Sequence, residues 1–175
     1  MTIATRLLTA ADAPILAGLL AANREFLAPW DPVREDSYYT ADGQREGIGA
    51  ALDQHERGTA IPHAIVDGER IVGRITLSNV VRGPFLSGNL GYWVNAADNG
   101  RGVATAAVAA IARLAFGEWE LHRIEAGTLL HNAGSQRVLE RNGFVRFGMA
   151  PRYLRIAGRW QDHFLYQALA ETSGG

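Results

Sequence analysis

The chain has 175 residues, of which 47% are hydrophobic and 20% are charged, with a formal net charge of −1. These values are ordinary for a globular protein and provide no overall positive field that would attract nucleic acid or an anionic membrane. All 17 residues in the lysine-plus-arginine class are arginines, and there is no cysteine, which excludes disulfide bonds, thiolate metal sites and cysteine nucleophiles.

The length favours one domain. We expect it to span residues 1–170, with residues 171–175 ("ETSGG") as a flexible tail. The N-terminal stretch has no basic region followed by a long apolar core, so it predicts no signal peptide. No apolar run approaches the roughly 20 residues that cross a bilayer. We therefore expect a cytoplasmic enzyme or binding module without membrane contacts.

The first third of the chain predicts one strand and two helices. Within residues 5–27 a short strand precedes a helix, with Asp12 as its N-cap and Pro14 in its first turn. Two prolines within residues 26–36 interrupt this helix. Residues 41–58 predict a weaker second helix, because its internal glycines lower the helix propensity.

The remainder predicts strands and helices in alternation. Two β-branched runs joined at Asp67-Gly68 form a hairpin signal, and two further strands turn near Ala157-Gly158. Between these hairpins we expect a strand, a helix, a strand and a helix that Gly143 ends, at residues 87–95, 99–116, 122–132 and 132–144. The predicted order is β-α-α-β-β-β-α-β-α-β-β, an α/β (α+β) fold with a mixed sheet and helices packed on it.

The helix expected over Asn99–Phe116 begins unusually, since Gly100 and Gly102 flank an arginine at its start. The first N–H groups of a helix have no partner inside it, and the helix dipole makes that end electropositive. Glycines let an anion approach the main chain closely, so the stretch indicates a phosphate cradle. The alternative is that the glycines form only a turn.

Two phosphate-binding motifs fit this stretch poorly. A Walker A loop requires a lysine, which the chain lacks. A dinucleotide fingerprint requires G-x-G-x-x-G in the first βαβ unit, whereas this pattern follows an antiparallel meander and has Thr105 in the place of its third glycine.

A third pattern, Q/R-x-x-G-x-G/A, fits better. "NGRGVA" matches it with Gly102 and Ala104, and Asn99 departs from it at the first place, which we expect to affect loop shape more than phosphate contacts. The stretch resembles the loop with which GNAT acetyltransferases bind the pyrophosphate of acetyl-CoA.

The predicted element order is also the order of elements in the GNAT family. "HNAGSQRVLERNGF" resembles the fourth-helix motif of that family. "LGYWV" and "YLRIAGRWQDHFLY" resemble the ribosomal-protein-alanine N-acetyltransferases of the RimJ/RimL type, and "NREFLAPWDPVRED" and "SNVVRG" resemble the RimJ branch.

The resemblance implies a set of residues that bind acetyl-CoA: Trp93, Val94, Asn99, Gly100, Arg101, Gly102, Val103, Ala104, Thr105, Asn132 and Ser135. Main-chain N–H groups of residues 101–105 would hold the pyrophosphate, and Arg101 would add a positive side chain unless it faces solvent. The main chain of Trp93 and Val94 would pair with the pantetheine arm as an added strand, although both side chains could be simple core residues. Asn132 would steady the cofactor; it could also simply be the helix N-cap, and the two roles can hold together.

For catalysis, Ser135 resembles the residue that gives a proton to the departing CoA thiolate. The alternative is that Ser135 is only a polar helix residue.

Glu125 is the best-placed carboxylate by sequence to act as general base, and its alternative is an ion pair with an arginine such as Arg123 or Arg141. The glutamate of RimL-type relatives falls at Leu154, so that role does not transfer. His131 could accept a proton near neutral pH, although a lone histidine is more often a packing or capping residue.

The resemblance implies direct acetyl transfer from acetyl-CoA to an amine, namely the α-amine of a protein N-terminus, ribosomal by resemblance. A free α-amine has a pKa near 7.7–8.0 against about 10.4 for lysine, so it needs less help from a base. The alternatives are a small-molecule amine such as an antibiotic or toxin, with an acceptor groove built from residues 24–39 and 78–85, and a non-catalytic acyl-CoA-binding module. We expect no metal, since the histidines lack ligand spacing, no direct contact with nucleic acid, and a monomer or homodimer.

Overall fold

The computed structural model describes residues 2–171, so residues 172–175 of the predicted tail lie outside it. Seven strands form one sheet in the order β1-β2-β3-β4-β5-β7-β6. In chain order they are β1 (Ile3–Leu7), β2 (Ile61–Asp67), β3 (Arg70–Val81), β4 (Ser87–Val94), β5 (Arg123–Leu129), β6 (Val145–Ile156) and β7 (Arg159–Leu169). Among the strands of residues 2–171, β4 and β5 are the one parallel pair, so the sheet is mixed, as predicted.

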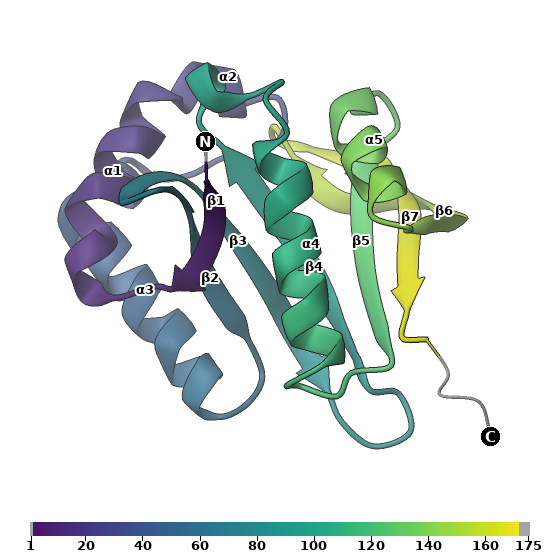
Figure 1. Ribbon diagram of the computed structural model, residues 1–175. Coiled ribbons are helices and arrows are strands. Elements are labelled where there is room, and N and C mark those ends of the chain that lie inside the picture. Colours follow the sequence, from purple (N-terminus) through teal and green to yellow (C-terminus); the bar gives the residue numbers. More distant parts are fainter. Residues whose placement is uncertain (1, 172–175) are drawn as a thin grey trace.

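Helices cover both faces of the sheet (Figure 1). They are α1 (Ala13–Ala22), α2 (Arg24–Leu27), α3 (Ala41–Glu56), α4 (Val103–Phe116) and α5 (Ala133–Arg141). The predicted order of the main elements is therefore confirmed. The segment predicted as an interruption, residues 26–36, overlaps the additional short helix α2 and is followed by a 3-10 turn over Asp36–Tyr39.

Two hydrophobic cores lie on opposite faces of the sheet. Ile65 of β2 packs in the core under α4, whereas Ala64 and Val66, its neighbours in the chain, pack under α1 and α3. This is the alternation that a strand imposes on successive side chains. In α4, the fully buried Ala107 and Ala115 have side chains small enough for the helix backbone to approach the sheet closely.

The turns follow the predicted chemistry. Gly68 and Gly143 have φ values of +61° and +76°, which glycine adopts without steric cost. Asp12 differs from the prediction: it stands at the N-cap of α1, but its carboxylate makes no capping bond there. It instead accepts hydrogen bonds from Arg6 and from the Thr9 N–H, because the chain enters α1 through a 3-10 turn.

The parallel strands β4 and β5 pair over three positions only, ending at Asn89↔Glu125. Beyond this point β4 remains paired with β3 as far as Val94, and β5 remains paired with β7 as far as Leu129. The carboxyl ends of β4 and β5 are thus held by different neighbours and diverge. Helices α4 and α5 cover one face of this part of the sheet (Figure 1).

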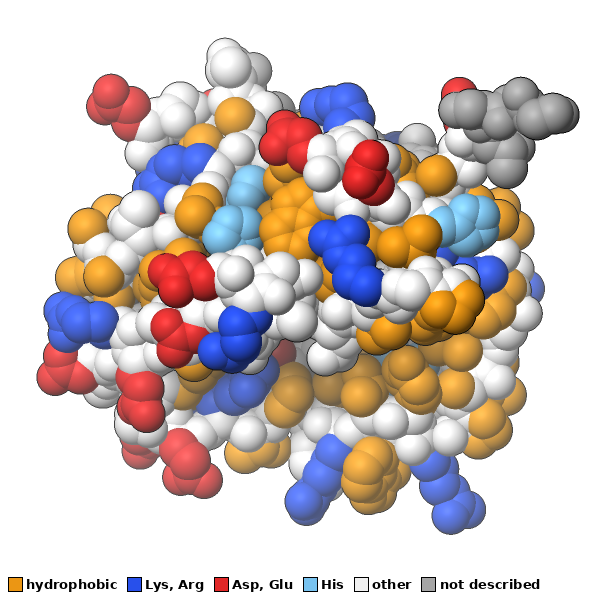
Figure 2. All heavy atoms as spheres, turned by 90° about the horizontal axis from the view of Figure 1, so that it is seen from below, with side chains coloured by type: hydrophobic (Ala, Val, Ile, Leu, Met, Phe, Trp, Pro, Cys, Tyr) orange, Lys and Arg blue, Asp and Glu red, His pale blue; other side chains and the backbone are white. Residues whose placement is uncertain are grey.

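Charges are mixed on the end of the molecule seen from below in Figure 2, where arginine and acidic side chains are interspersed with hydrophobic ones. Within residues 2–171, none of the helices has the length and apolar character required to cross a membrane.

Candidate functional site

A cavity of about 540 Å³ lies where β4 and β5 diverge. It is enclosed by the segment around α2, the end of β4, the start of α4 and the start of α5. Ten of the eleven residues predicted to bind the cofactor line it: Trp93, Val94, Asn99, Gly100, Gly102, Val103, Ala104, Thr105, Asn132 and Ser135. The structure therefore brings together residues that are up to 42 positions apart in the chain.

The start of α4 presents backbone donors to this cavity. Gly100 and Gly102 have φ values of +74° and +81°, and Gly102 is the N-cap of the helix. The N–H of Ala106 donates to the Gly102 carbonyl, so the N–H groups of residues 103–105 have no acceptor inside the helix. Since residues 102–105 line the cavity, an anion there would meet free donors and the positive end of the helix dipole.

A buried carboxylate fixes the loop that leads into α4. The side chain of Asp98 is 4% exposed and accepts two hydrogen bonds from Arg70 of β3 and one from Asn95. The Arg70 guanidinium is the main cause that lowers the pKa of Asp98 to about 2. Asn23, at the end of α1, donates to the Asn95 side chain and accepts from the Ala96 N–H. The loop is thus tied to two other elements.

Asn99, the departure from the family pattern, also shapes this loop. Its amide donates to the carbonyls of Val94 and Asn95, both at 3.1 Å.

Arg101 is the one predicted cofactor residue that does not line the cavity. Its side chain is 53% exposed, and its guanidinium lies 3.5 Å from Asp98.

The last residues of β4 present a free strand edge to the cavity. The Asn95 N–H donates to Val72 on β3, so the N–H and C=O of Val94 point to the opposite edge. The Val94 carbonyl accepts the Asn99 amide there, and no β5 residue pairs with Val94. This edge can accept a further extended chain, as an exposed strand does in β-augmentation.

The start of α5 lies against the end of β4. Asn132 is the helix N-cap, since its side chain accepts the Ser135 N–H at 3.1 Å, and the capping alternative is confirmed. The Ser135 hydroxyl lies 2.8 Å from the Tyr92 hydroxyl. Burial raises the pKa of Tyr92 to about 12, against a smaller opposing effect of the Ser135 hydrogen bond. The phenol therefore stays protonated near neutral pH.

The other candidate catalytic residues lie differently. Glu125 lines neither this cavity nor the smaller one described below, and its carboxylate lies 3.4 Å from Arg123, which is the ion pair considered as its alternative. Leu154, the place of the RimL-type glutamate, is 46% exposed on β6. His131 does line the cavity, and its ring lies 5.4 Å from that of Trp30.

The sequence analysis assigned no role to Tyr92 or Arg137, which line the cavity. Trp30 entered it only within the acceptor groove over residues 24–39, and Arg141 only as a possible partner of Glu125, and both also line the cavity. Tyr92 stands inside the quoted "LGYWV" motif, so the motif was a signal for it. The arginines are spaced i, i+4 on α5, which places them on one side of the helix.

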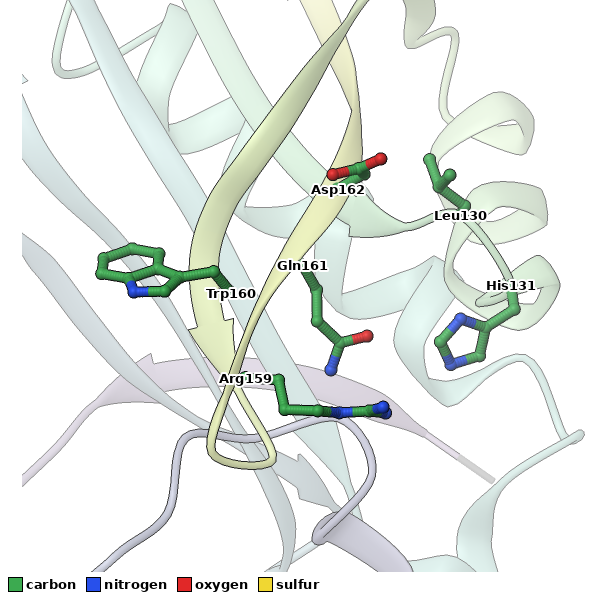
Figure 3. Close-up of a pocket in the computed structure, with 6 residues that line it drawn as sticks. All are labelled: Leu130, His131, Arg159, Trp160, Gln161 and Asp162. Atoms are coloured by element: carbon green, nitrogen blue, oxygen red, sulfur yellow. The ribbon is translucent and has the colours of Figure 1, made fainter.

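A second cavity of about 320 Å³ adjoins the hairpin of β6 and β7 (Figure 3). It is lined by Leu130, His131, Arg159, Trp160, Gln161 and Asp162. The loop after α2 packs against this hairpin, because the Ala157 N–H donates to the Asp31 carbonyl at 3.0 Å. Residues 78–85, predicted as part of an acceptor groove, line neither cavity and lie at the other end of β4.

We predict that Asp98→Asn destabilises the protein by about 1.5–3 kcal/mol at neutral pH, because a charged hydrogen-bonded pair with Arg70 is lost. Because the folded-state pKa is lowered, this stabilisation is present above the ordinary pKa of about 3.8 and is lost as the pH falls toward 2. Urea unfolding at several pH values from 7 to 3 measures the difference between variant and wild type.

The control for this experiment is Asp42→Asn, since the Asp42 side chain is 95% exposed in its pair with Arg45 and should contribute little. An Asp98→Asn variant as stable as wild type at pH 7, or a gap that does not narrow toward pH 3, would contradict the role of Asp98.

Comparison with known proteins agrees with this geometry. Residues 3–145 match the family model of the acetyltransferase (GNAT) domain. The chain is 38% identical over 164 residues to a probable N-acetyltransferase, YjcK, of Bacillus subtilis, covering 93% of this chain and 91% of that protein. It is also 38% identical over 162 residues to the ribosomal protein uS5-alanine N-acetyltransferase of Escherichia coli, covering 91% and 84%.

A solved structure of Mycobacterium smegmatis RimJ in complex with CoA-disulfide matches with a TM-score of 0.94 and 30% identity, covering 99% of this chain and 84% of that one. The family match spans most of the chain, and these relatives align over nearly its full length. The chain belongs to the GNAT acetyltransferase family and is of the RimJ/RimL type.

Proposed function

We propose that this protein transfers the acetyl group of acetyl-CoA to the α-amine of a protein N-terminus. Family membership makes the chain an acetyl-CoA-dependent N-acetyltransferase, and the proposal concerns how it binds the cofactor and which amine it uses. The observation that carries it is that one cavity is lined by the donors of α4, the free edge of β4 and the Tyr92–Ser135 pair.

In this proposal the pyrophosphate lies over residues 101–105. The free N–H groups of residues 103–105 and the helix dipole stabilise its charge, and the two glycines with positive φ keep side chains away from it. Building a Cβ on either glycine meets no atom within 4 Å, so the space before the helix is open to a ligand. The RimJ relative solved in complex with CoA-disulfide supports CoA as the ligand.

The pantetheine arm then extends along the free edge of β4. Its two amide groups are spaced like peptide groups and can pair with the main chain near Val94. Running along this edge would carry the thioester toward Ser135, because the Tyr92 hydroxyl, two residues before Val94, contacts the Ser135 hydroxyl.

Ser135 and Tyr92 act on the leaving group. The amine nitrogen attacks the thioester carbonyl carbon, the C–N bond forms, the C–S bond breaks and the sulfur leaves as a thiolate. Because the Tyr92 phenol stays protonated, it can donate to the Ser135 oxygen, which leaves the serine proton available to the sulfur. A donor already aimed at developing charge lowers the barrier more than it improves ground-state binding.

An N-terminal acceptor is favoured by chemistry and by relatives. An α-amine is neutral to a sizeable extent near pH 7.5, whereas a lysine amine is almost fully protonated. The Escherichia coli relative is named for acetylating an alanine of a ribosomal protein, which supports a protein N-terminus that begins with a small residue.

We predict that Gly102→Ala abolishes most of the thermal stabilisation that CoA gives to wild type, because the added Cβ and its resistance to positive φ disturb the cradle. Gly58→Ala is the matched control: Gly58 has a φ of +72°, also has nothing within 4 Å, and lines neither cavity. Each variant should lose about 1–2 kcal/mol of unfolding free energy, but only Gly102→Ala should lose the response to CoA. Equal responses to CoA would show that the cradle is misplaced.

We predict that Ser135→Ala lowers kcat by roughly ten- to a hundredfold, about 1.4–2.7 kcal/mol, with little change in KM for acetyl-CoA. Tyr92→Phe should lower kcat less, since it removes only the bond that orients the serine. Ser78→Ala serves as control because Ser78 lines neither cavity. A rise in KM for acetyl-CoA with kcat unchanged would mean that Ser135 only holds the cofactor.

We predict that peptides beginning with Ala or Ser are acetylated on the α-amine and that internal lysines are not. Mass spectrometry of one peptide that carries both amines locates the acetyl group. The initial rate should rise with pH toward the α-amine pKa and then level off. Acetylation of the lysine, or of a small-molecule amine while peptides stay inert, would refute the N-terminal acceptor and favour the alternative.

A further inference from the structure

We propose that His131 accepts the proton of the acceptor amine, and that the second cavity holds the end of the acceptor chain. The proposal rests on the proposed function, since it names the proton acceptor and the acceptor subsite of the same reaction. It differs from the sequence-based expectation that Glu125 is the base.

Among residues 2–171, His131 is the one that lines both cavities. It therefore stands between the space that the thioester would reach and the open, polar space beside the β6–β7 hairpin. A general base must lie within hydrogen-bond reach of the proton that it removes, directly or through one water. An amine that enters from the second cavity and attacks a thioester in the first would pass this imidazole.

No other side chain that lines the first cavity suits the task. Asp98 is fully engaged by Arg70 and Asn95, and its lowered pKa makes it a weak base. Tyr92 remains protonated near neutral pH, and Arg137 and Arg141 carry guanidinium groups, which do not give up a proton in proteins. Imidazole is the side chain that changes charge between pH 5 and 8.

A ring contact holds the imidazole of His131 in position, and its nitrogens make no hydrogen bond within residues 2–171. Its ring packs against Trp30 with a centroid distance of 5.4 Å and an interplanar angle of 35°. Within residues 2–171 neither ring nitrogen has a hydrogen-bond partner, in contrast to His55, His63 and His163. Figure 3 shows the ring on the α5 side of the cavity, turned toward Gln161 and Arg159, while the Trp160 ring points away.

Charged residues from several elements line the two cavities beside His131. Arg159 and Asp162 come from β7, Arg137 and Arg141 from α5, and Asp98, whose negative charge Arg70 balances, from the loop before α4. Asp162, whose carboxylate accepts the Arg152 N–H at 2.8 Å, offers a hydrogen-bond acceptor to the incoming neutral amine.

One proton leaves the amine for the free imidazole nitrogen as the C–N bond forms. The CoA sulfur takes the Ser135 proton as the C–S bond breaks. Solvent then receives the imidazolium proton and returns one to the serine, so the products are the N-acetyl amine and CoA thiol.

The test compares His131→Gln with His122→Gln and Glu125→Gln, using acetyl-CoA and an Ala-terminated peptide from pH 6 to 9.5. His122 is exposed before β5 and lines neither cavity, so its variant is the matched control. His131→Gln should lower kcat/KM for the peptide by a hundredfold or more at pH 7 and flatten the acidic limb of the kcat profile. Stabilisation by CoA should stay at the wild-type level, and both other variants should keep the wild-type profile.

Rescue by a small base separates chemistry from structure. Added imidazole should restore part of the rate of His131→Ala in a saturable manner, which a merely structural role would not allow. Asp162→Asn should raise KM for the peptide several-fold with little change in kcat.

Full activity of His131→Gln, or the flattened profile in Glu125→Gln instead, would overturn the role of His131 and leave the proposed function standing. A wild-type enzyme that acetylates no peptide would refute the proposed function, and the same variants assayed on the amine that it does use would still test His131.

Discussion

The short parallel contact between β4 and β5 is the constraint on which the site depends. Three paired positions join the two halves of the sheet, and beyond Asn89↔Glu125 each strand is held by a different neighbour, β3 or β7. The right-handed twist of each half then separates the strand ends instead of closing them. The same divergence exposes the edge of β4. The first turn of α4 and the start of α5 then lie around the gap between the two strand ends (Figure 1).

Rigid loops turn this gap into a site with fixed donors. Asp98, bound by Arg70, anchors the loop before α4, and Asn142 joins the two helices by donating to the Thr105 carbonyl at 3.2 Å. Donors that are held in place before the ligand arrives cost little reorganisation when charge appears near them. Asp98 is negative, but its arginine partner balances its charge, so it steadies the loop without opposing an anion at the helix start.

Local rules predicted much of this arrangement. The glycines around Arg101, the N-cap Asn132 and the hairpin turn at Asp67-Gly68 depend on backbone preferences that a short stretch of sequence carries. The pairing of Tyr92 with Ser135 joins residues 43 positions apart, and no local rule contains it. Glu125 shows the limit most clearly: its neighbours Ile124 and Ala126 pack under α4, so strand alternation directs its own side chain to the other face.

The most direct test of the account is to follow backbone amide signals by NMR while adding the two halves of the cofactor separately. ADP should shift the amides of residues 102–105, and pantetheine should shift those near Val94 and Ser135, because CoA binding is divided between the start of α4 and the free edge of β4. The complete CoA should shift both sets together. Shifts confined to the β6–β7 hairpin, or ADP and pantetheine acting on the same residues, would contradict it.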